Sequence, residues 1–174
     1  MAAKQQKFIL KVPDYYGPSE RKAIGVDVVT KIRERTEERG VDKSGRTFAK
    51  YSDGYKKSLD FKIAGKSSKV DLTLSGDMLG ALKVLDTSSN GTIVIGFERG
   101  SEENARAEGN ILGSYGKTPG TGPRRDFLGL PGREIQEILK YYPKGVEARE
   151  RAAKRLETRE AAEIIGEGIE RDGD

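Results

Sequence analysis

Apolar and polar residues follow two different periods in the first part of the chain. The run from Phe8 to Val12 is apolar except for one lysine and is ended by Pro13, a pattern that predicts a strand. The stretch from about Pro18 to Arg39 repeats its apolar residues at steps of four, which predicts an amphipathic helix ended by Gly40. These repeating residues are Ile24, Val28 and Ile32. The opposite face of this helix carries the charged residues Lys22, Lys31, Arg33, Arg35 and Glu37.

The regular pattern breaks down after Val41. Asp42-Lys-Ser-Gly45 is typical of a turn, and the aromatic residues beyond it are scattered among Lys, Ser and Gly. We expect residues 41–69 to form an extended arm that wraps around the body without a long regular element. The anchors of this arm would be the aromatic rings of Phe48, Tyr51 and Tyr55.

The middle of the chain predicts a short helix and then a hairpin. Apolar residues from Leu72 to Leu82 fit a short buried helix. Residues 83–87 and 92–97 are β-prone and flank Asn90-Gly91. Asn-Gly between such segments is typical of a hairpin with a type I′ turn, because both residues tolerate the positive φ that this turn requires. Two helical turns, from Glu102 to Glu108 and closed by Gly109, are expected to follow.

The last part of the chain predicts a loop and two helices. Residues 110–122 contain four glycines and one proline, so we expect a long flexible loop. Residues 131–142 predict a helix whose apolar residues point inward. Residues 144–174 are densely charged and carry only a thin apolar stripe. A helix this polar gains little from packing on its own body, so we expect it to protrude or to dock on another subunit.

Together these elements predict an α+β fold. It would consist of a small, mainly antiparallel sheet with an N-terminal amphipathic helix, short helices and a protruding charged C-terminal helix. Residues 1–143 would form the body, with the arm and the glycine-rich loop, and residues 144–174 the charged helix.

Composition narrows the chemistry that this fold could support. The 174 residues include no cysteine and no histidine, which excludes zinc sites and nucleophiles activated by an imidazole. Carboxylate, lysine or tyrosine chemistry remains, as does a hard metal ion held by oxygen atoms. No apolar run approaches the roughly 20 residues of a membrane span, and the polar start leads us to expect no signal peptide.

The charge is unevenly distributed. Residues 144–174 contain seven Lys or Arg and nine Asp or Glu, so the net charge of +4 divides into −2 there and +6 in residues 1–143. A mildly basic body is compatible with weak attraction to nucleic acid, although scattered surface lysines of a soluble protein explain the same charge.

Two segments resemble known ligand sites only in part. Gly113 to Thr118 is similar to the end of a phosphate-binding loop, but Ile111 stands where that motif needs glycine and Pro119 where it needs a helix. Asp71, Asp77 and Asp86 could supply oxygen ligands to a nuclease metal, yet nothing in their spacing forces them together. We therefore expect no cofactor and no metal site.

Arg124 and Arg125 stand beside Phe127 and Leu128. Arginine and aromatic residues are enriched at protein–protein hot spots, and an arginine pair can also contact phosphates. Alternatively, the arginines are solvated while Phe127 closes the core. We expect the interface role, together with the exposed face of the charged helix. The interface residues predicted there are Arg149, Leu156 and Arg159.

Four segments in a fixed order carry a family resemblance. They are Gly45-Arg-Thr-Phe-Ala-Lys-Tyr-Ser52, Val70-Asp-Leu-Thr-Leu-Ser-Gly-Asp-Met-Leu79, Val94-Ile-Gly-Phe97 and Pro123-Arg-Arg-Asp-Phe-Leu-Gly-Leu130. This ordered set, which covers about residues 20–142, resembles the tail-completion, neck or virion-morphogenesis proteins of tailed bacteriophages.

The resemblance implies a ring-forming structural subunit, without catalysis or a cofactor, between the connector end of the capsid and the tail. Its partners would be copies of itself, connector or head-completion proteins, and tail-terminator or tail-tube proteins. Non-specific contact with DNA in the channel is possible on this view, and contact with a membrane is not implied. The protein would reside in the virion, and in the host cytoplasm during assembly.

Two other classes of function stay open on the sequence alone. A nucleic-acid-binding module would concentrate basic residues and aromatic rings on one face. A nuclease would hold a metal ion by carboxylate oxygens.

Overall fold

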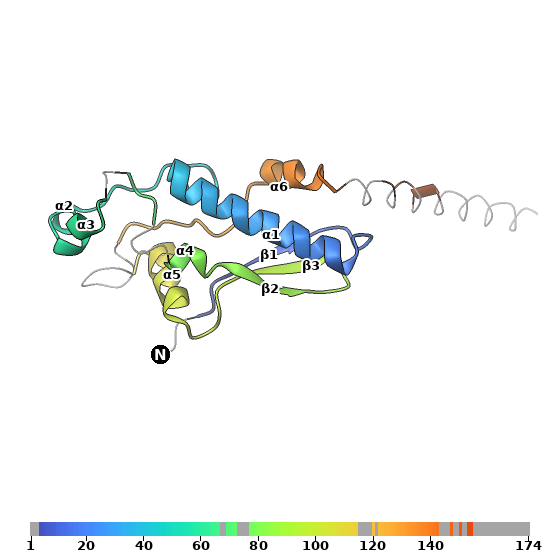
Figure 1. Cartoon of the computed structure of the whole chain (residues 1–174), viewed down its shortest axis with the longest axis horizontal. Helices are drawn as coiled ribbons and strands as arrows, with labels where there is room; N and C mark the ends of the chain where they lie inside the picture. The colour runs from blue at the N-terminus through green and yellow to red at the C-terminus, as the bar shows by residue number, and fades with distance from the viewer. Residues whose placement is uncertain are drawn as a thin grey trace, which may run out of the picture.

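A computed structural model describes residues 4–66, 69–72, 77–114, 120, 122–142, 147, 150 and 153–154. Its elements, in chain order, are β1 (Lys7–Lys11), α1 (Pro18–Glu34), the π-helical turn η1 (Arg35–Arg39), α2 (Asp53–Lys56), α3 (Leu59–Ile63), α4 (Asp77–Gly80), β2 (Lys83–Thr87), β3 (Thr92–Gly96), α5 (Glu102–Leu112) and α6 (Gly132–Leu139). Figure 1 shows α1 running along a small sheet, with α4 and α5 near one end of the strands and α2 and α3 set apart. The predicted α+β class is confirmed.

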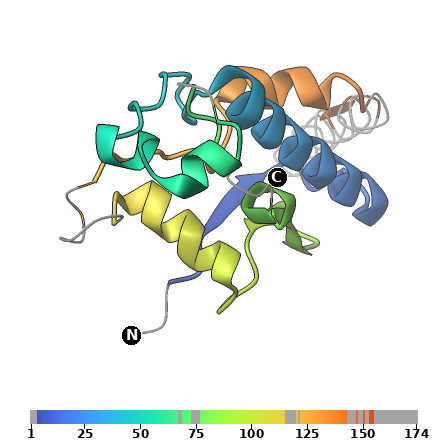
Figure 2. The ribbon, with the colours of Figure 1, turned by 60° about the vertical axis from the view of Figure 1, so that its left-hand side comes forward.

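The sheet has three strands in the order β1-β3-β2 and is antiparallel throughout. The predicted hairpin is formed by β2 and β3, and the N-terminal strand β1 pairs with the far side of β3. Helix α1 lies across one face of the sheet, in contact with β2 and β3. Helix α6 packs beside α1 (Figure 2), and the Tyr142 hydroxyl just beyond it donates to Asp27 Oδ2 at 2.6 Å.

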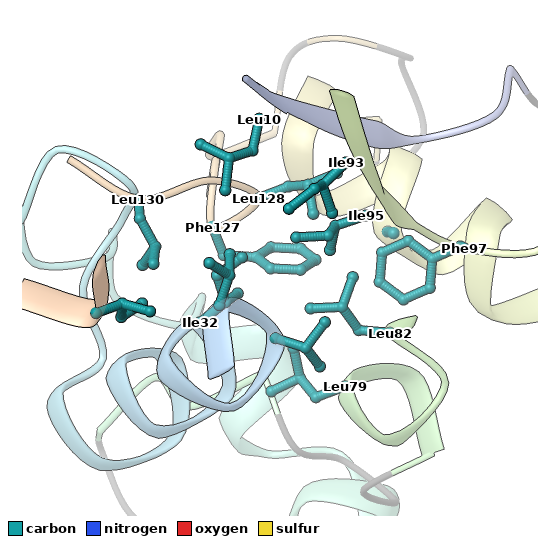
Figure 3. Packing of buried hydrophobic residues seen from close by; sticks show 14 of the residues in the cluster. Leu10, Ile32, Leu79, Leu82, Ile93, Ile95, Phe97, Phe127, Leu128 and Leu130 are labelled. Carbon is teal, nitrogen blue, oxygen red and sulfur yellow. The ribbon is translucent and has the colours of Figure 1, made fainter. Parts of the chain in front are cut away.

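The core lies between the inner face of the sheet and the covering helices. The predicted stripe of α1 is fully buried, as are Ile93 and Ile95 of β3. Leu79 and Leu82 close one side of the core, and Figure 3 shows how they meet the strand residues. Burying a side chain of this size contributes about 1.5–3 kcal/mol.

The charged face predicted for the helix over residues 18–39, which the structure divides into α1 and η1, is not all at the surface. Arg35 is 1 % exposed, and its Nη2 donates to the carbonyls of Phe127 at 3.0 Å and Gly129 at 2.6 Å. Arg33 is half-buried, and its guanidinium binds carbonyls around α4, with Nε 2.8 Å from Leu79 O. The sequence had placed both arginines with the polar face. Both reach inward because a guanidinium group can donate to several main-chain carbonyls at once, including Leu79 O, which also accepts from Leu82 N at 3.2 Å.

The turn of the hairpin differs from the predicted type I′. Gly91 has a φ of +76°, but Asn90 does not have a positive φ. Gly91 N donates to Ser88 O at 3.3 Å, and Ser88 N donates to Thr92 O at 2.8 Å. This geometry is that of a type I turn followed by a left-handed glycine. The carbonyl of Gly91 also accepts from Val12 N at 2.9 Å, which ties the turn to the end of β1.

Helix α5 is longer than its sequence suggested. It continues through Gly109 to Leu112 and ends at Gly113, which has a φ of +69°. The first residues of the predicted glycine-rich loop are therefore helical. Asn110 explains part of this extension, because its side chain donates to Arg106 O within the helix and to the sulfur of Met78 on α4.

Candidate functional site

The segment 123–130 was expected to supply an interface, and the structure assigns most of it to the interior. Phe127 is fully buried, with its ring centroid 6.2 Å from that of Phe97 in an edge-to-face arrangement, and Leu128 is also buried. Only Arg124 of the four predicted residues is exposed. Phe127 closes the core, as the alternative expected, but only one of the two arginines, Arg124, is exposed as that alternative required. Figure 3 shows Phe127 and Leu128 between β1 and α1.

Arg125 is an internal anchor rather than a surface contact. It is 7 % exposed, and its guanidinium donates to Ala49 O at 3.2 Å. The same group lies 5.5 Å from the centroid of the Tyr51 ring, within the range of a cation–π interaction. Arg125 therefore joins the segment 123–130 to the start of the arm, and its predicted inter-subunit role is corrected.

The other three predicted interface residues, Arg149, Leu156 and Arg159, lie outside the described residues.

The arm contains a small aromatic cluster. Phe48 is buried in the main core, as an anchor should be. Tyr51 and Tyr55 are half-buried and pack with Phe61, which is 9 % exposed. The centroid of the Phe61 ring lies 5.7 Å from that of Tyr51 and 5.4 Å from that of Tyr55. Phe61 was not predicted as an anchor. Its position as an aromatic residue in a lysine-rich stretch could have indicated that it is buried.

Helix caps set the geometry of this cluster. Ser52 Oγ accepts from Tyr55 N at 3.2 Å at the start of α2, and Ser58 Oγ accepts from Phe61 N at 3.3 Å at the start of α3. Burial raises the pKa of Tyr51 and of Tyr55, and nearby carboxylates, Asp71 for both, raise them further. Both phenols therefore stay neutral at physiological pH, and nothing in this arrangement activates them.

Helix α3 turns its remaining apolar residues outward. Leu59 is 70 % exposed and Ile63 is 75 % exposed, and their spacing of four residues places them on one side of the helix. Figure 1 shows α2 and α3 set apart from the sheet, at one end of the molecule. The arm thus presents an apolar pair on a support that its own aromatic cluster holds in place. We call Leu59 and Ile63 the arm pair.

The sheet has a second candidate surface on the face opposite α1. Lys7, Ile9 and Lys11 of β1 point to this face and are exposed, with Ile9 at 53 %. Val94 of β3 is half-buried, and Asp86 of β2 is exposed opposite it. We call this the outer face of the sheet. No described helix packs on it.

A β-bulge decides where Asp86 points. The pairing runs from Val84 opposite Ile95 to Asp86 opposite Val94, so one residue of β2 is skipped. Without this bulge the alternation of the strand would place Asp86 opposite Ile93, in the core. The bulge therefore turns the carboxylate to the outer face.

The sequence offered two candidate ligand sites, an aspartate cluster for a metal ion and a segment similar to a phosphate-binding loop. Within the described part of the chain, no three Asp or Glu side chains come close enough to share a metal ion. Asp86 lies on the outer face of the sheet, whereas the Asp71 carboxylate pairs with the Lys66 ammonium. Most of the segment similar to a phosphate-binding loop, residues 115–119, lies outside the described residues.

None of the helices formed by described residues is long and apolar enough to cross a bilayer. Comparison of the chain with protein-family models, with curated proteins and with solved structures found no match in any of the three.

Proposed function

We propose that this protein is a non-enzymatic structural subunit that acts by assembling with copies of itself and with neighbouring proteins. The observation that carries the proposal is the arm pair. Two large aliphatic side chains at 70 % and 75 % exposure, held outward on one short helix, expose apolar surface that another protein can bury.

The contacts within the arm support the view that the exposed arm pair forms an interface. The aromatic cluster and two serine caps order α2 and α3 before any partner binds. Ordering in advance lowers the entropy cost of association. An apolar projection that fits a different patch on the next copy forms a head-to-tail contact, and such contacts generate rings when the rotation closes.

The kind of assembly is proposed from the resemblance described above. Its segments include Gly45–Ser52 at the base of the arm and Pro123–Leu130, whose Arg125 anchors that base. We therefore propose a role in the neck of a tailed bacteriophage, as a tail-completion or head-to-tail joining subunit in the virion. The assembly partners would be a connector or head-completion protein and a tail-terminator or tail-tube protein.

The test is the mass of the native protein and of its variants. We expect the purified chain to form oligomers, alone or when mixed with phage particle fractions. Changing Leu59→Ser together with Ile63→Ser should shift the population toward monomer by about tenfold in dissociation constant, because two exposed apolar contacts are lost.

The matched control is Lys62→Ser, an exposed polar position on the same helix, which should leave the oligomer unchanged. Thermal unfolding should be similar for all three proteins. A wild-type chain that stays monomeric at every concentration and never associates with particles would contradict the proposed function.

We do not favour the nucleic-acid-binding alternative. Several basic side chains are engaged by carboxylates, such as Lys43 with Asp126 at 2.7 Å and Lys83 with Glu98 at 2.9 Å. Salt-dependent DNA binding by the monomer at micromolar strength would reverse this preference.

A further inference from the structure

Within the part of the chain that the structure describes, both edges of the three-stranded sheet are open. Strand β3 is central and pairs with β1 on one side and β2 on the other. Among the described residues, the backbone of β1 and of β2 forms hydrogen bonds with β3 alone. An open edge presents unpaired N–H and C=O groups and can pair with another strand.

The alternation of the ladder shows which groups of β1 are open. Gln6 O accepts from Phe97 N at one end of β1, and Val12 N donates to Gly91 O at the other. Even-numbered residues of β1 therefore bond to β3, and the N–H and C=O groups of Lys7, Ile9 and Lys11 point away from it. These are the residues whose side chains lie on the outer face.

The two edges differ in charge on that face: the β1 edge is positive, and the β2 edge is net negative once Glu98, which neutralises Lys83, is counted. Edge strand β1 presents Lys7 and Lys11 on either side of Ile9. Edge strand β2 presents Asp86, which the bulge has turned outward, and Lys83, which pairs with Gly96 and whose ammonium is bound by Glu98 Oε2 at 2.9 Å. Opposite charges on neighbouring strands stabilise a pair, and like charges opposite each other destabilise it.

This charge pattern distinguishes between two ways of joining copies. A two-fold contact between two β1 edges would set Lys7 and Lys11 of one copy against the same lysines of the other. A contact between β1 of one copy and β2 of the next brings the lysines to an edge that carries Asp86 and the neutralised Lys83–Glu98 pair. The second arrangement is head-to-tail and repeats along one direction, so it suits a ring.

We propose that copies of this chain join by pairing β1 of one subunit with β2 of the next, forming a continuous sheet around the ring. Because β1 and β2 are both antiparallel to β3, the joining strands run parallel when successive subunits keep the same orientation. The inference rests on the proposed function, for which it names an interface. The occupant of each edge is a second copy of the same protein.

The first test uses the unmodified protein. Equal amounts of ¹⁴N- and ¹⁵N-labelled chain are mixed, allowed to exchange, and treated with a carbodiimide, which joins a carboxylate directly to an amine. We expect mixed-isotope cross-links between Asp86 and Lys7 or Lys11. If every cross-link between these residues joins two peptides with the same isotope label, the contact lies within one chain. That result would overturn the proposal.

The second test reverses the charges. Lys7→Glu with Lys11→Glu, or Asp86→Lys alone, should each weaken the oligomer by about tenfold in dissociation constant. Combining all three changes should restore most of the affinity, because the attraction is re-formed with its signs exchanged. Lys22→Glu is the control, since it lies exposed on α1 and should change nothing. Thermal unfolding of each variant checks that the fold is retained.

The outcomes separate the two claims. If the wild-type chain forms oligomers that ignore the charge reversals, or if the combined variant is no tighter than the single reversals, this interface is wrong while the proposed function stands. If the wild-type chain forms no oligomer and joins no particle, the proposed function itself fails.

Discussion

Arg35 connects three parts of the chain that are far apart in sequence. Its guanidinium reaches the carbonyls of Phe127 and Gly129, and the carboxylate of Glu134 on α6 lies 3.8 Å away. Burial lowers the pKa of Arg35, and Glu134 opposes that shift. Glu134 also accepts from Arg39 at 3.1 Å. One charged side chain thus holds η1, the segment 123–130 and α6 together.

Removing this side chain should be costly. Arg35→Met leaves two buried carbonyls without their donor and Glu134 with a single partner, so we expect a loss of about 3–5 kcal/mol in the free energy of unfolding. Chemical denaturation measures it. Arg133→Met is the control, because that side chain is 84 % exposed and its change should stay within about 0.5 kcal/mol. Equal stability of the two variants would show that Arg35 is not an anchor.

Asp42 organises the turn that begins the arm. Its Oδ1 accepts from Ser44 N at 2.8 Å and Arg46 N at 2.9 Å, and its Oδ2 accepts from Arg46 Nε at 3.0 Å. Burial alone would raise the pKa of Asp42, but the hydrogen bonds from Arg46 and Ser44 outweigh it, so the pKa lies below its ordinary value.

This shift predicts a pH dependence. A carboxyl whose pKa is lower in the folded state stabilises the fold above its unfolded pKa of about 3.9 and loses that contribution as the pH falls through the folded value. Asp42→Asn should therefore be less stable than wild type near neutral pH, with the difference shrinking below about pH 4. Urea denaturation of both proteins across this range measures it. A difference that stays constant into acid would contradict the assignment.

At the scale of the element, the β2–β3 hairpin depends on one close approach. A Cβ on Gly91 would lie 1.9 Å from Val12 O, in addition to the strain of a φ of +76°. The approach exists because Gly91 O accepts from Val12 N just after β1, which joins the hairpin to the end of the N-terminal strand.

Comparing Gly91→Ala with Gly100→Ala separates two contributions to the loss of stability, namely backbone strain and the steric clash of the new Cβ. Gly100 has a similar φ of +83°, but its Cβ would meet nothing within 4 Å. We expect Gly100→Ala to cost about 1–2 kcal/mol through backbone strain alone. Gly91→Ala should cost roughly 2 kcal/mol more, because the oxygen of Val12 must move and its neighbouring hydrogen bond is lost. Thermal or urea unfolding reports both, and equal costs would mean that the approach is easily relaxed.

At the scale of the whole molecule, the described residues from β1 to α6 share one core. The buried apolar residues run from Leu10 to Ile138, and α6 closes the core against α1. Two surfaces around this core have no partner within the described chain. The arm pair and the outer face of the sheet are those surfaces.

Deleting residues 145–174 should leave this body folded. We expect a thermal midpoint close to that of the full chain and weaker assembly, because the charged segment is predicted to dock on another subunit. Circular dichroism during heating and native mass measurement test the two parts separately. Unfolding of the truncated chain would show that the segment belongs to the core.

Local patterns determined the elements of this fold. The steps of four in α1 and the β-prone segments around Asn90-Gly91 specify a helix and a hairpin wherever they occur, because the period of side chains is a property of the backbone itself. The absence of histidine and cysteine likewise limits the chemistry without reference to any fold.

Only the tertiary structure decided which side chains are inside. Arg35 and Arg125 look like surface residues in the sequence, yet both are buried because carbonyls from distant segments converge on their guanidinium groups. The same holds for Phe127, which a neighbouring arginine pair made a candidate for the surface. Whether such a side chain is buried depends on the groups that contact it. Those groups belong to segments that are far apart in the sequence and that only the tertiary structure brings together.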